Sequence, residues 1–598
     1  MNEEQLFNVR HSLAHVLAAA VRRIYGADKV KLGIGPVIEN GFYYDFDLGD
    51  IKISEDDLPK IEKEMRKIIA EKQEFVGEEK TLEEAVKWEK SAGQPYKLEL
   101  LEDLEKEDAK ITFYTNGDFA DLCRGGHVAN TIDIPADAFK LTKVAGAYWR
   151  GDEKNTMMTR IYGVAFESKQ KLDEYLNMLE EAEKRDHRKL GKELDLFVIS
   201  DLIGAGLPLF TPRGTILRRQ LDNLVQSLRD EYGYQEVNIP HITKKDAYIA
   251  SGHWEKFKDE LFRITTREGH EFAMKPMNCP HHTQIYASQT RSYRDLPIRY
   301  RETTTCYRDE QSGELSGLSR VRSLTQDDAH VFCRVSQVEQ EILNVWDIIN
   351  RFYKTVGFDE LKVRFSTHDP ASMDVYSGTE EKWLSTENQL LNVITKKLGN
   401  DYMDGVGEAA FYGPKIDFIA RDAIGRTWQV ATIQLDFNQP EGFDLTCIDE
   451  NGERERIVMV HAAIMGSIER FLSIYIEHTA GKFPIWCAPE QLRVIKVKDD
   501  AKVDELCAKI MNLAKEYGVR AELDDSNNSV GKKIRAAETW KVPYSVVVGE
   551  KEAASDKLPL RIRSDLAANE SAEHTYAPEQ LMKSIANEIR GRVSKSSL

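Results

Sequence analysis

The chain has 598 residues, several times the roughly 100 to 200 residues that one hydrophobic core usually supports, so we expect three or more domains. Hydrophobic residues make up 41% and charged residues 30%, a balance typical of globular proteins that excludes wholesale disorder. The net charge of −18 argues against non-specific coating of nucleic acid, which relies on a basic surface.

No stretch approaches the roughly 18 uninterrupted apolar residues that a membrane span needs. The first residues also lack the basic and apolar regions of a signal peptide, so we expect a cytoplasmic protein without a membrane partner. The seven cysteines are odd in number and follow no repeated spacing. A disulfide framework is therefore not expected, and any special cysteine should be a metal ligand or a nucleophile.

Residues 1–166 combine several kinds of predicted element. A helix is expected over Asn8–Tyr25, strand-like alternation runs through Gly41–Phe46, and an acidic amphipathic helix is expected from about Leu58 to Phe75. The mixture predicts one α+β domain.

Two pairs of ligand-type side chains lie in this first domain. His11 and His15 are four residues apart and share a helix face, and Cys123 and His127 repeat that spacing in a turn that contains glycine. The four groups could hold zinc or form a hydrolytic pocket. A metallopeptidase would need Glu after the first His, where Ser12 stands. A lone pair of this spacing is usually incidental, but a second pair strengthens the case.

Residues 167–193 predict a single long exposed helix, because they contain no proline, one glycine and dense Glu and Lys. We interpret this segment as a linker. Residues 194–488 have many turn breaks and β-rich runs such as 415–437, which favours a large antiparallel sheet with flanking helices.

From residue 489 to 598, short apolar strands alternate with helices, which predicts a small doubly wound α/β domain. Residues 491–598 contain 19 Lys and Arg against 17 Asp and Glu, a charge of +2, which leaves −20 for the rest. A polyanion would be repelled less at this end of the chain, although an ordinary mixed surface explains the same charge counts.

The middle of the chain contains further candidates. Cys279, His330 and His461 are scattered over about 180 residues, so their spacing identifies no metal site, and each alone is typical of a packed core. Arg308 and Glu310 are expected to alternate on one strand, followed by a Ser- and Gly-containing loop and more arginines. Guanidinium groups bind phosphate oxygens bidentately, although an Arg-rich hairpin more often forms surface salt bridges.

The order of motifs resembles the class II aminoacyl-tRNA synthetases. The segment around Pro240 resembles motif 1, Arg308-Asp-Glu310 with Arg320 resembles motif 2, and Gly466–Arg470 resembles motif 3. Further segments are similar to the threonyl-tRNA synthetase family: HSLAH, CRGGH, AGAYWRGD, GHWEKF, MKPMNCP, TQDDAH, GEAAFYGPKIDF, WQVATIQLDF and VGKKIR. The resemblance implies an antiparallel-sheet catalytic core, an N-terminal α+β editing domain and a C-terminal α/β anticodon-binding domain.

The resemblance implies one Zn²⁺ per subunit, held by Cys279, His330 and His461 with an open position. Threonine would complete the coordination through its amino and hydroxyl groups. A site that must ligate a hydroxyl rejects valine but cannot exclude serine, so a correcting site is needed. The implied substrate-binding residues are Gln326, Asp328 and Tyr412 for the amino group, and Gln434, which frames the pocket.

For ATP, which would bind with Mg²⁺, the resemblance implies that Arg308 holds the α-phosphate and Glu310 the adenine edge. Arg320 would hold the outer phosphates, and Arg470 would stack on adenine. The implied editing residues are His11, His15, Lys97, Asp121, Cys123 and His127, with a structural zinc site as the alternative. The implied anticodon-binding residues are Asn527, Glu552 and Arg561, and motif 1 implies a homodimer.

Three features depart from the family pattern. Leu324 stands where an aromatic residue usually stacks on adenine, and His281 replaces a glycine after Met-Asn-Cys-Pro. His281 could compete as a ligand or require a backbone adjustment. Only ten residues precede His11, so we expect the chain to lack the usual N-terminal ubiquitin-like domain.

Three functions could make use of these motifs. The first is a ligase that uses ATP to join threonine to its tRNA and hydrolyses seryl-tRNA. The second is a non-catalytic tRNA-binding relative, which would require loss of motif arginines that are all present. The third is a free-standing metal-dependent hydrolase, which would leave some 400 residues unexplained. The sequence therefore favours the ligase.

Overall fold

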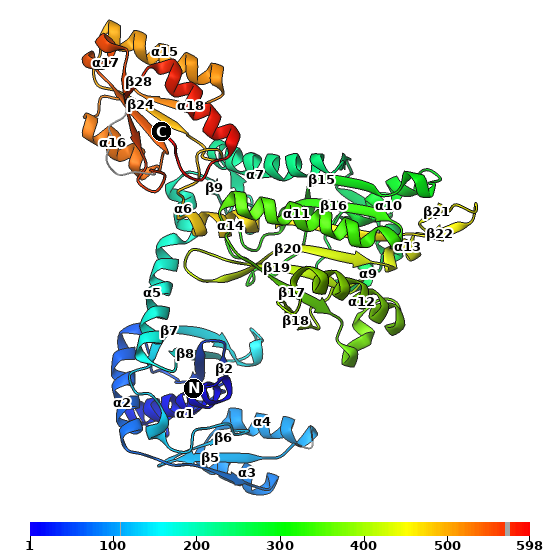
Figure 1. Ribbon diagram of the computed structural model, residues 1–598. Coiled ribbons are helices and arrows are strands. Elements are labelled where there is room, and N and C mark those ends of the chain that lie inside the picture. Colours follow the sequence, from blue (N-terminus) through cyan, green and yellow to red (C-terminus); the bar gives the residue numbers. More distant parts are fainter. Residues whose placement is uncertain (108, 568–574) are drawn as a thin grey trace. The chain divides into compact units, whose positions relative to one another are not determined.

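The computed structural model describes residues 1–107, 109–567 and 575–598. The chain divides into two compact units, Met1–Glu180 and Glu181–Leu598, and each is considered by itself (Figure 1). Within the described residues, none of the helices carries an apolar stretch long enough to span a bilayer.

The first unit contains a sheet in which all pairings are antiparallel and helices α1 (Glu3–Tyr25) and α2 (Leu58–Ala70) pack against it. The strands have the order β1-β3-β8-β7, with β2 also paired to β3. Their bounds are β1 (Lys31–Leu32), β2 (Val37–Ile38), β3 (Gly41–Asp47), β7 (Phe139–Tyr148) and β8 (Met157–Ala165). Helix α1 begins five residues before its predicted start, because Asn2 and Gln5 form a capping box.

A smaller three-stranded sheet completes this unit and supplies part of the candidate N-terminal site. Strands β4 (Phe75–Glu79), β5 (Thr112–Asn116) and β6 (Phe119–Leu122) pair in that order. Helices α3 (Leu82–Ala92) and α4 (Pro95–Lys106) pack together beside them. The predicted extension of α2 to Phe75 is wrong, because Phe75 begins β4.

The predicted single helix over 167–193 is also wrong. The segment forms α5 (Lys169–Arg185) and α6 (His187–Glu193), with a break at Asp186, whose φ and ψ are −46° and 122°. The Asp186 carboxylate accepts a hydrogen bond of 2.7 Å from the Arg188 amide. Asp186 therefore acts as the N-cap of α6 and starts a new helix, although helix propensity alone would continue α5.

The second unit is built on an eight-stranded sheet that confirms the predicted antiparallel core (Figure 1). Only the pairings β11–β15 and β17–β18 are parallel. The strands, in sheet order, are β11 (Gln235–Glu236), β15 (Ile298–Tyr307), β16 (Ser323–Cys333), β23 (Val458–Ser467), β20 (Thr427–Asp436), β19 (Lys415–Arg421), β17 (Leu361–Thr367) and β18 (Met403–Val406).

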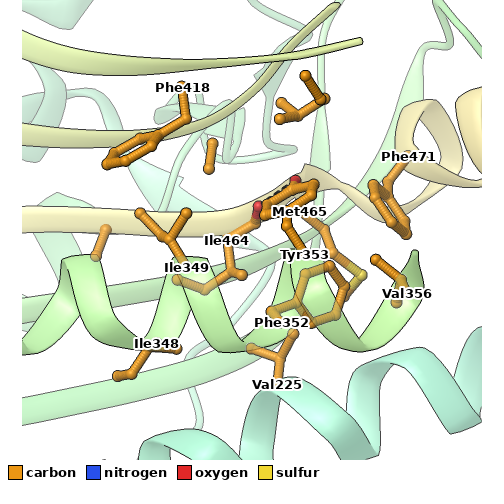
Figure 2. Packing of buried hydrophobic residues seen from close by; sticks show 14 of the residues in the cluster. Val225, Ile348, Ile349, Phe352, Tyr353, Val356, Phe418, Ile464, Met465 and Phe471 are labelled. Carbon is orange, nitrogen blue, oxygen red and sulfur yellow. Dashed lines mark hydrogen bonds between the residues drawn. The ribbon is translucent and has the colours of Figure 1, made fainter. Parts of the chain in front are cut away.

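Three helices pack with this sheet to form the main core: α7 (Pro212–Glu231), α11 (Val338–Val356) and α14 (Ile468–Thr479). Figure 2 shows Phe352 and Tyr353 of α11 between strand and helix side chains such as Ile464 and Phe471. The Tyr353 hydroxyl donates a 2.7 Å hydrogen bond to the Ile464 carbonyl, so the buried phenol is satisfied. The core thereby fixes one face of β23 and leaves alternate residues to face the other way.

The C-terminal part of this unit confirms the predicted alternation of strands and helices. Its sheet order is β25-β24-β26-β27-β28, from β24 (Leu492–Lys496), β25 (Ala521–Asp524), β26 (Tyr544–Val548), β27 (Leu558–Ile562) and β28 (Thr575–Tyr576). The first three strands are parallel, whereas β27 and β28 are antiparallel, so the sheet is mixed. Its helices are α15 (Ala501–Tyr517), α16 (Val530–Thr539), α17 (Glu550–Ser555) and α18 (Pro578–Gly591).

Candidate functional site

The fold brings together three candidate metal ligands that are far apart in sequence. The ligand atoms of Cys279, His330 and His461 all lie within 4.8 Å of one another, and all three residues are buried. His330 on β16 is the cross-strand partner of His461 on β23, and Cys279 begins α10 (Cys279–Ala287). Directly opposed residues on antiparallel strands have neighbouring side chains, which explains how the two imidazoles meet.

The surroundings of these three groups fit a metal ion. His461 Nε2 lies 2.9 Å from the Asp436 carboxylate, and His330 Nδ1 lies 2.8 Å from His282 Nδ1, so each ring keeps one nitrogen for a ligand. Contacts of this kind orient imidazole ligands in metal sites. Burial and the nearby Asp328 raise the pKa of the Cys279 thiol well above its usual value, and a bound cation would offset that effect. One thiolate and two imidazoles are a donor set that suits zinc.

The predicted substrate-binding residues surround the same cavity of about 130 Å³. Gln326, Asp328 and His330 alternate along β16, and this spacing of two, visible in the sequence, places all three side chains on one face. The Asn278 side-chain amide donates a 2.9 Å hydrogen bond to Asp328. The residues with predicted roles that line the cavity are Cys279, Arg308, Gln326, Asp328, His330, Tyr412, Gln434 and His461. The Tyr412 hydroxyl donates a hydrogen bond to the Gln434 side chain.

The predicted nucleotide-binding residues lie next to this cavity. Arg470, near the start of α14, lines a second cavity of about 110 Å³ that shares Thr432 and Ala463 with the first. The expectation that Arg308 and Glu310 alternate on a strand is wrong, because β15 ends at Tyr307 and both follow it. Arg308 and Arg470 therefore line two neighbouring cavities that share residues.

Glu310 and Arg320, which were predicted to contact different parts of ATP, contact each other. Arg320 Nε lies 2.7 Å from Glu310 Oε2, and Arg320 also pairs with Glu314 at 3.1 Å. The Arg322 guanidinium donates to the Glu310 carbonyl at 2.9 and 3.0 Å. Sequence reasoning assigned no separate role to Arg322, although its position two residues after Arg320 gave the signal.

The two departures in this region have distinct outcomes. Leu324 is half-buried on β16. His281 is not part of the ligand cluster in the described residues, and its Nε2 hydrogen-bonds the Thr243 hydroxyl. His282 contacts His330 instead. Sequence reasoning missed His282, although its position one helical turn after Cys279 predicts a shared face.

The first unit brings its two ligand-type pairs together. Cys123 Sγ lies 3.3 Å from His11 Nε2 and 3.2 Å from His127 Nε2, and the four ligand atoms, including that of His15, lie within 4.8 Å of one another. Ser12 Oγ lies 3.2 Å from His127 Nδ1. The arrangement suits either a bound metal or a polar hydrolytic pocket, the two alternatives that the sequence predicts.

A buried ion pair accompanies this cluster. Lys97 Nζ lies 2.6 Å from Asp121 Oδ1, and the Tyr44 hydroxyl donates to the same carboxylate. Burial raises the pKa of Cys123 to about 12. Burial, with His15 and His11 nearby, lowers the pKa of His127 to about 2. The thiol and this imidazole are therefore neutral at pH 7 beside a charged pair. Tyr44 was missed, although it lies in the predicted aromatic strand.

The three predicted anticodon-binding residues are only partly brought together. Asn527 follows β25 and Glu552 lies in α17 after β26, so both are near the carboxyl edge of the parallel strands. Arg561 on β27 is opposite Ser545, three residues before the last residue of β26. In the part of the chain that the structure describes, no ion pair joins Arg561 to Glu552.

Comparisons with known proteins match all three parts of the chain. The tRNA synthetase class II core domain (G, H, P, S and T) matches residues 262–479, the anticodon binding domain residues 491–588, and the threonyl and alanyl tRNA synthetase second additional domain residues 111–162. Threonine–tRNA ligase of Phocaeicola vulgatus is 46% identical over 98% of this chain and 89% of its own length. That of Deinococcus radiodurans is 47% identical over 93% and 85%. The chain belongs to the threonine–tRNA ligase family.

Solved structures agree with this family membership. The RNA-binding domain of threonyl-tRNA synthetase from Cryptosporidium parvum is 34% identical, with a TM-score of 0.63 over 67% of this chain and 98% of that one. A putative threonyl-tRNA synthetase from Aeropyrum pernix is 30% identical, with a TM-score of 0.60 over 68% and 96%. The expected class II architecture is confirmed, and a free-standing hydrolase is not supported, because the family match spans nearly the whole chain.

Proposed function

We propose that this threonine–tRNA ligase family member activates threonine with ATP and transfers it to the terminal ribose of its tRNA. The threonine carboxylate attacks the α-phosphorus, pyrophosphate leaves, and the ribose hydroxyl then displaces AMP from the adenylate. The observation that carries the proposal is one cavity that unites Cys279, His330 and His461 with Asp328 and Arg308. We assign editing to residues 1–166, linkage to 167–193, catalysis to 194–488 and anticodon binding to 489–598.

Threonine selection follows from the donor set of the cavity. A Zn²⁺ ion held by Cys279, His330 and His461 would supply Lewis-acid binding of an amino group and a hydroxyl. Asn278 holds Asp328 in place. The Asp328 carboxylate can attract the ammonium group of threonine before the amino group binds the metal. Gln326, Tyr412 and Gln434 surround the remaining space with hydrogen-bonding groups. A polar site of this kind rejects valine, because bound valine would leave polar groups of the site without a hydrogen-bonding partner.

The arginines provide charge for the nucleotide. Arg308 lines the threonine cavity, so its guanidinium suits the α-phosphate at the point where carboxylate and phosphorus react. Glu310 and Arg320 bind adenine and the outer phosphates in this proposal, and Arg470 stacks on the base, while Mg²⁺ accompanies the phosphates. ATP must then replace the Glu310–Arg320 ion pair.

The first unit hydrolyses seryl-tRNA in this proposal. Water adds to the ester carbonyl, the bond to the ribose oxygen breaks, and serine and free tRNA leave. Ring nitrogens of His11, His15 and His127 can accept hydrogen bonds from the attacking water, and Lys97 with Asp121 supplies fixed charge. Cys123 completes the polar wall.

Two further assignments concern partners. Asn527, Glu552 and Arg561 contact anticodon bases, since amide, carboxylate and guanidinium groups address the edges of unstacked bases. The segment around Pro240 forms a symmetric homodimer interface.

Charging of a threonine tRNA transcript with labelled threonine, ATP and Mg²⁺ tests the ligase proposal. Wild-type protein should form threonyl-tRNA, and Arg308→Ala should reduce the rate by about two orders of magnitude, the scale of losing one charge-stabilising donor. Absence of any threonyl-tRNA with folded, metal-loaded protein would overturn the proposal.

A further inference from the structure

His187, the first residue of α6, connects three segments of the second unit. Its ring is buried, and Nδ1 lies 2.7 Å from Glu477 Oε1 on α14. The His187 backbone amide donates to the same oxygen at 3.1 Å. On the other side of the ring, the Leu318 amide donates a 3.1 Å hydrogen bond to Nε2. One imidazole thus bridges the linker, the motif 2 loop and the motif 3 helix.

These contacts fix the state of the ring. Because the Leu318 amide is a donor, Nε2 must be an acceptor, and the single ring proton lies on Nδ1, which donates to Glu477. Burial acts against the charge of Glu477, but hydrogen bonds from His187 and Arg426 outweigh it and lower the pKa of Glu477. Asp186, His187 and Glu477 are close enough to form a ligand cluster, yet His187 has no ring nitrogen free for a metal.

The motif 2 loop is packed tightly on this ring. Gly317 has a φ of +51°, and a Cβ atom added there would lie 2.3 Å from His187 Nε2. The next residue, Leu318, is fully buried in the main core. Ser319 Oγ then donates a 3.0 Å hydrogen bond to Ser473 Oγ on α14. The loop is therefore anchored through the Leu318 amide and the Ser319 hydroxyl, immediately before Arg320.

The far side of Glu477 is also held in place. Arg426 lies 2.7 Å from Glu477 Oε2, and the Asp422 carboxylate holds Arg426 at 2.7 Å. Glu477, which accepts the His187 hydrogen bond, is therefore held by Arg426 on the hairpin between β19 and β20. A change at His187 should move the motif 2 loop rather than Glu477.

We propose that His187 is a positioning residue for ATP: its imidazole ties the motif 2 loop to α14 and so sets the backbone from which Arg320 and Glu310 reach the nucleotide. The inference rests on the proposed ATP contacts of Arg320. It assigns the linker a part in the activation step, because α6 contributes a direct contact to the ATP-binding loop.

The test compares His187→Gln with His187→Asn in ATP/pyrophosphate exchange by the full-length protein. The Gln side chain reaches the position of Nε2 and keeps an acceptor for Leu318, whereas Asn keeps only the Glu477 contact. His187→Asn and His187→Ala should raise KM for ATP about three- to tenfold, the effect of losing one buried hydrogen bond, without changing KM for threonine. His187→Gln should restore most of the ATP affinity.

Lys189→Ala, an exposed position on the same helix, is the matched control and should behave as wild type. Equal rises in KM for ATP and threonine, or a Gln variant as impaired as Asn, would overturn the positioning role. Arg320→Ala distinguishes the proposed role of Arg320 from the inferred role of His187. No effect of Arg320→Ala on KM for ATP would remove the proposed function of Arg320 and this inference together, whereas an effect there with unchanged His187 variants would remove the inference alone.

Discussion

At the scale of single residues, the proposed function assigns the choice between threonine and valine to the cavity around His330. The two histidines keep one ring nitrogen each because Asp436 and His282 occupy the other. Their orientation is therefore set before any ligand binds. In the proposed function, selection would depend on the chemistry of the amino acid hydroxyl rather than on the shape of an apolar pocket.

Removing a ligand of this site should remove the metal and the activity together. We expect one zinc per wild-type chain, and loss of zinc in Cys279→Ser and His330→Ala, with threonine activation reduced about 100-fold or more, since an open site needs all three donors. Metal analysis by mass spectrometry, combined with threonine-dependent exchange, measures both. Fully active protein without zinc would contradict the prediction.

Mutation of the His and Cys cluster in the first unit distinguishes an editing site from a structural zinc site. Changing His11 and His15 to Ala should leave the unit folded and threonine charging intact, while seryl-tRNA accumulates. The physical reason is that the buried pair Lys97 and Asp121 remains, but two of the three imidazoles that hold the attacking water are gone. Deacylation of preformed seryl-tRNA measures the effect directly.

Two other outcomes would exclude this assignment. Unfolding of the first unit with release of metal would establish the structural zinc interpretation. Clearance of seryl-tRNA at the wild-type rate by the folded double variant would show that the histidines are not editing residues.

At the scale of elements, the regular patterns were predictable from sequence and the contacts between distant elements were not. Turn breaks and β-rich runs such as 415–437 predicted the central antiparallel sheet, and the alternation of short apolar strands with helices predicted the C-terminal part. The break at Asp186 was missed because capping overrides helix propensity over a single residue. The pairing of His282 with His330 requires the packing of α10 on β16, which no local pattern contains.

The candidate site was predictable for a different reason. Spacing did not connect Cys279, His330 and His461, and only resemblance to a family did. The structure adds the register of β16 and β23, which makes the two histidines direct neighbours. It also adds the Glu310–Arg320 pair, whose formation depends on the path of the loop rather than on the motif.

The position of β27 leads to a prediction about tRNA recognition. Arg561 is exposed on this strand, and a guanidinium group can address the edge of an unstacked base. Arg561→Ala should weaken charging of threonine tRNA by about 1 to 3 kcal/mol, the scale of one base contact, and leave pyrophosphate exchange unchanged. Steady-state kinetics with varied tRNA measures this difference. Equal loss of both activities would show that the residue is structural.

At the scale of the whole molecule, the proposed interface around Pro240 predicts a homodimer, since symmetric pairs are the commonest assemblies. Light scattering of active protein should give about twice the 68.3 kDa of one chain. A mass of one chain for fully active protein would contradict the proposed interface.

The central claim is that the cavity around Cys279, His330 and His461 selects threonine by its hydroxyl group. Amino-acid-dependent ATP/pyrophosphate exchange with threonine, serine and valine tests it most directly. We predict strong exchange with threonine, measurable exchange with serine, and exchange with valine at least about 100-fold weaker than with threonine. Exchange with valine comparable to that with threonine would contradict selection by the hydroxyl.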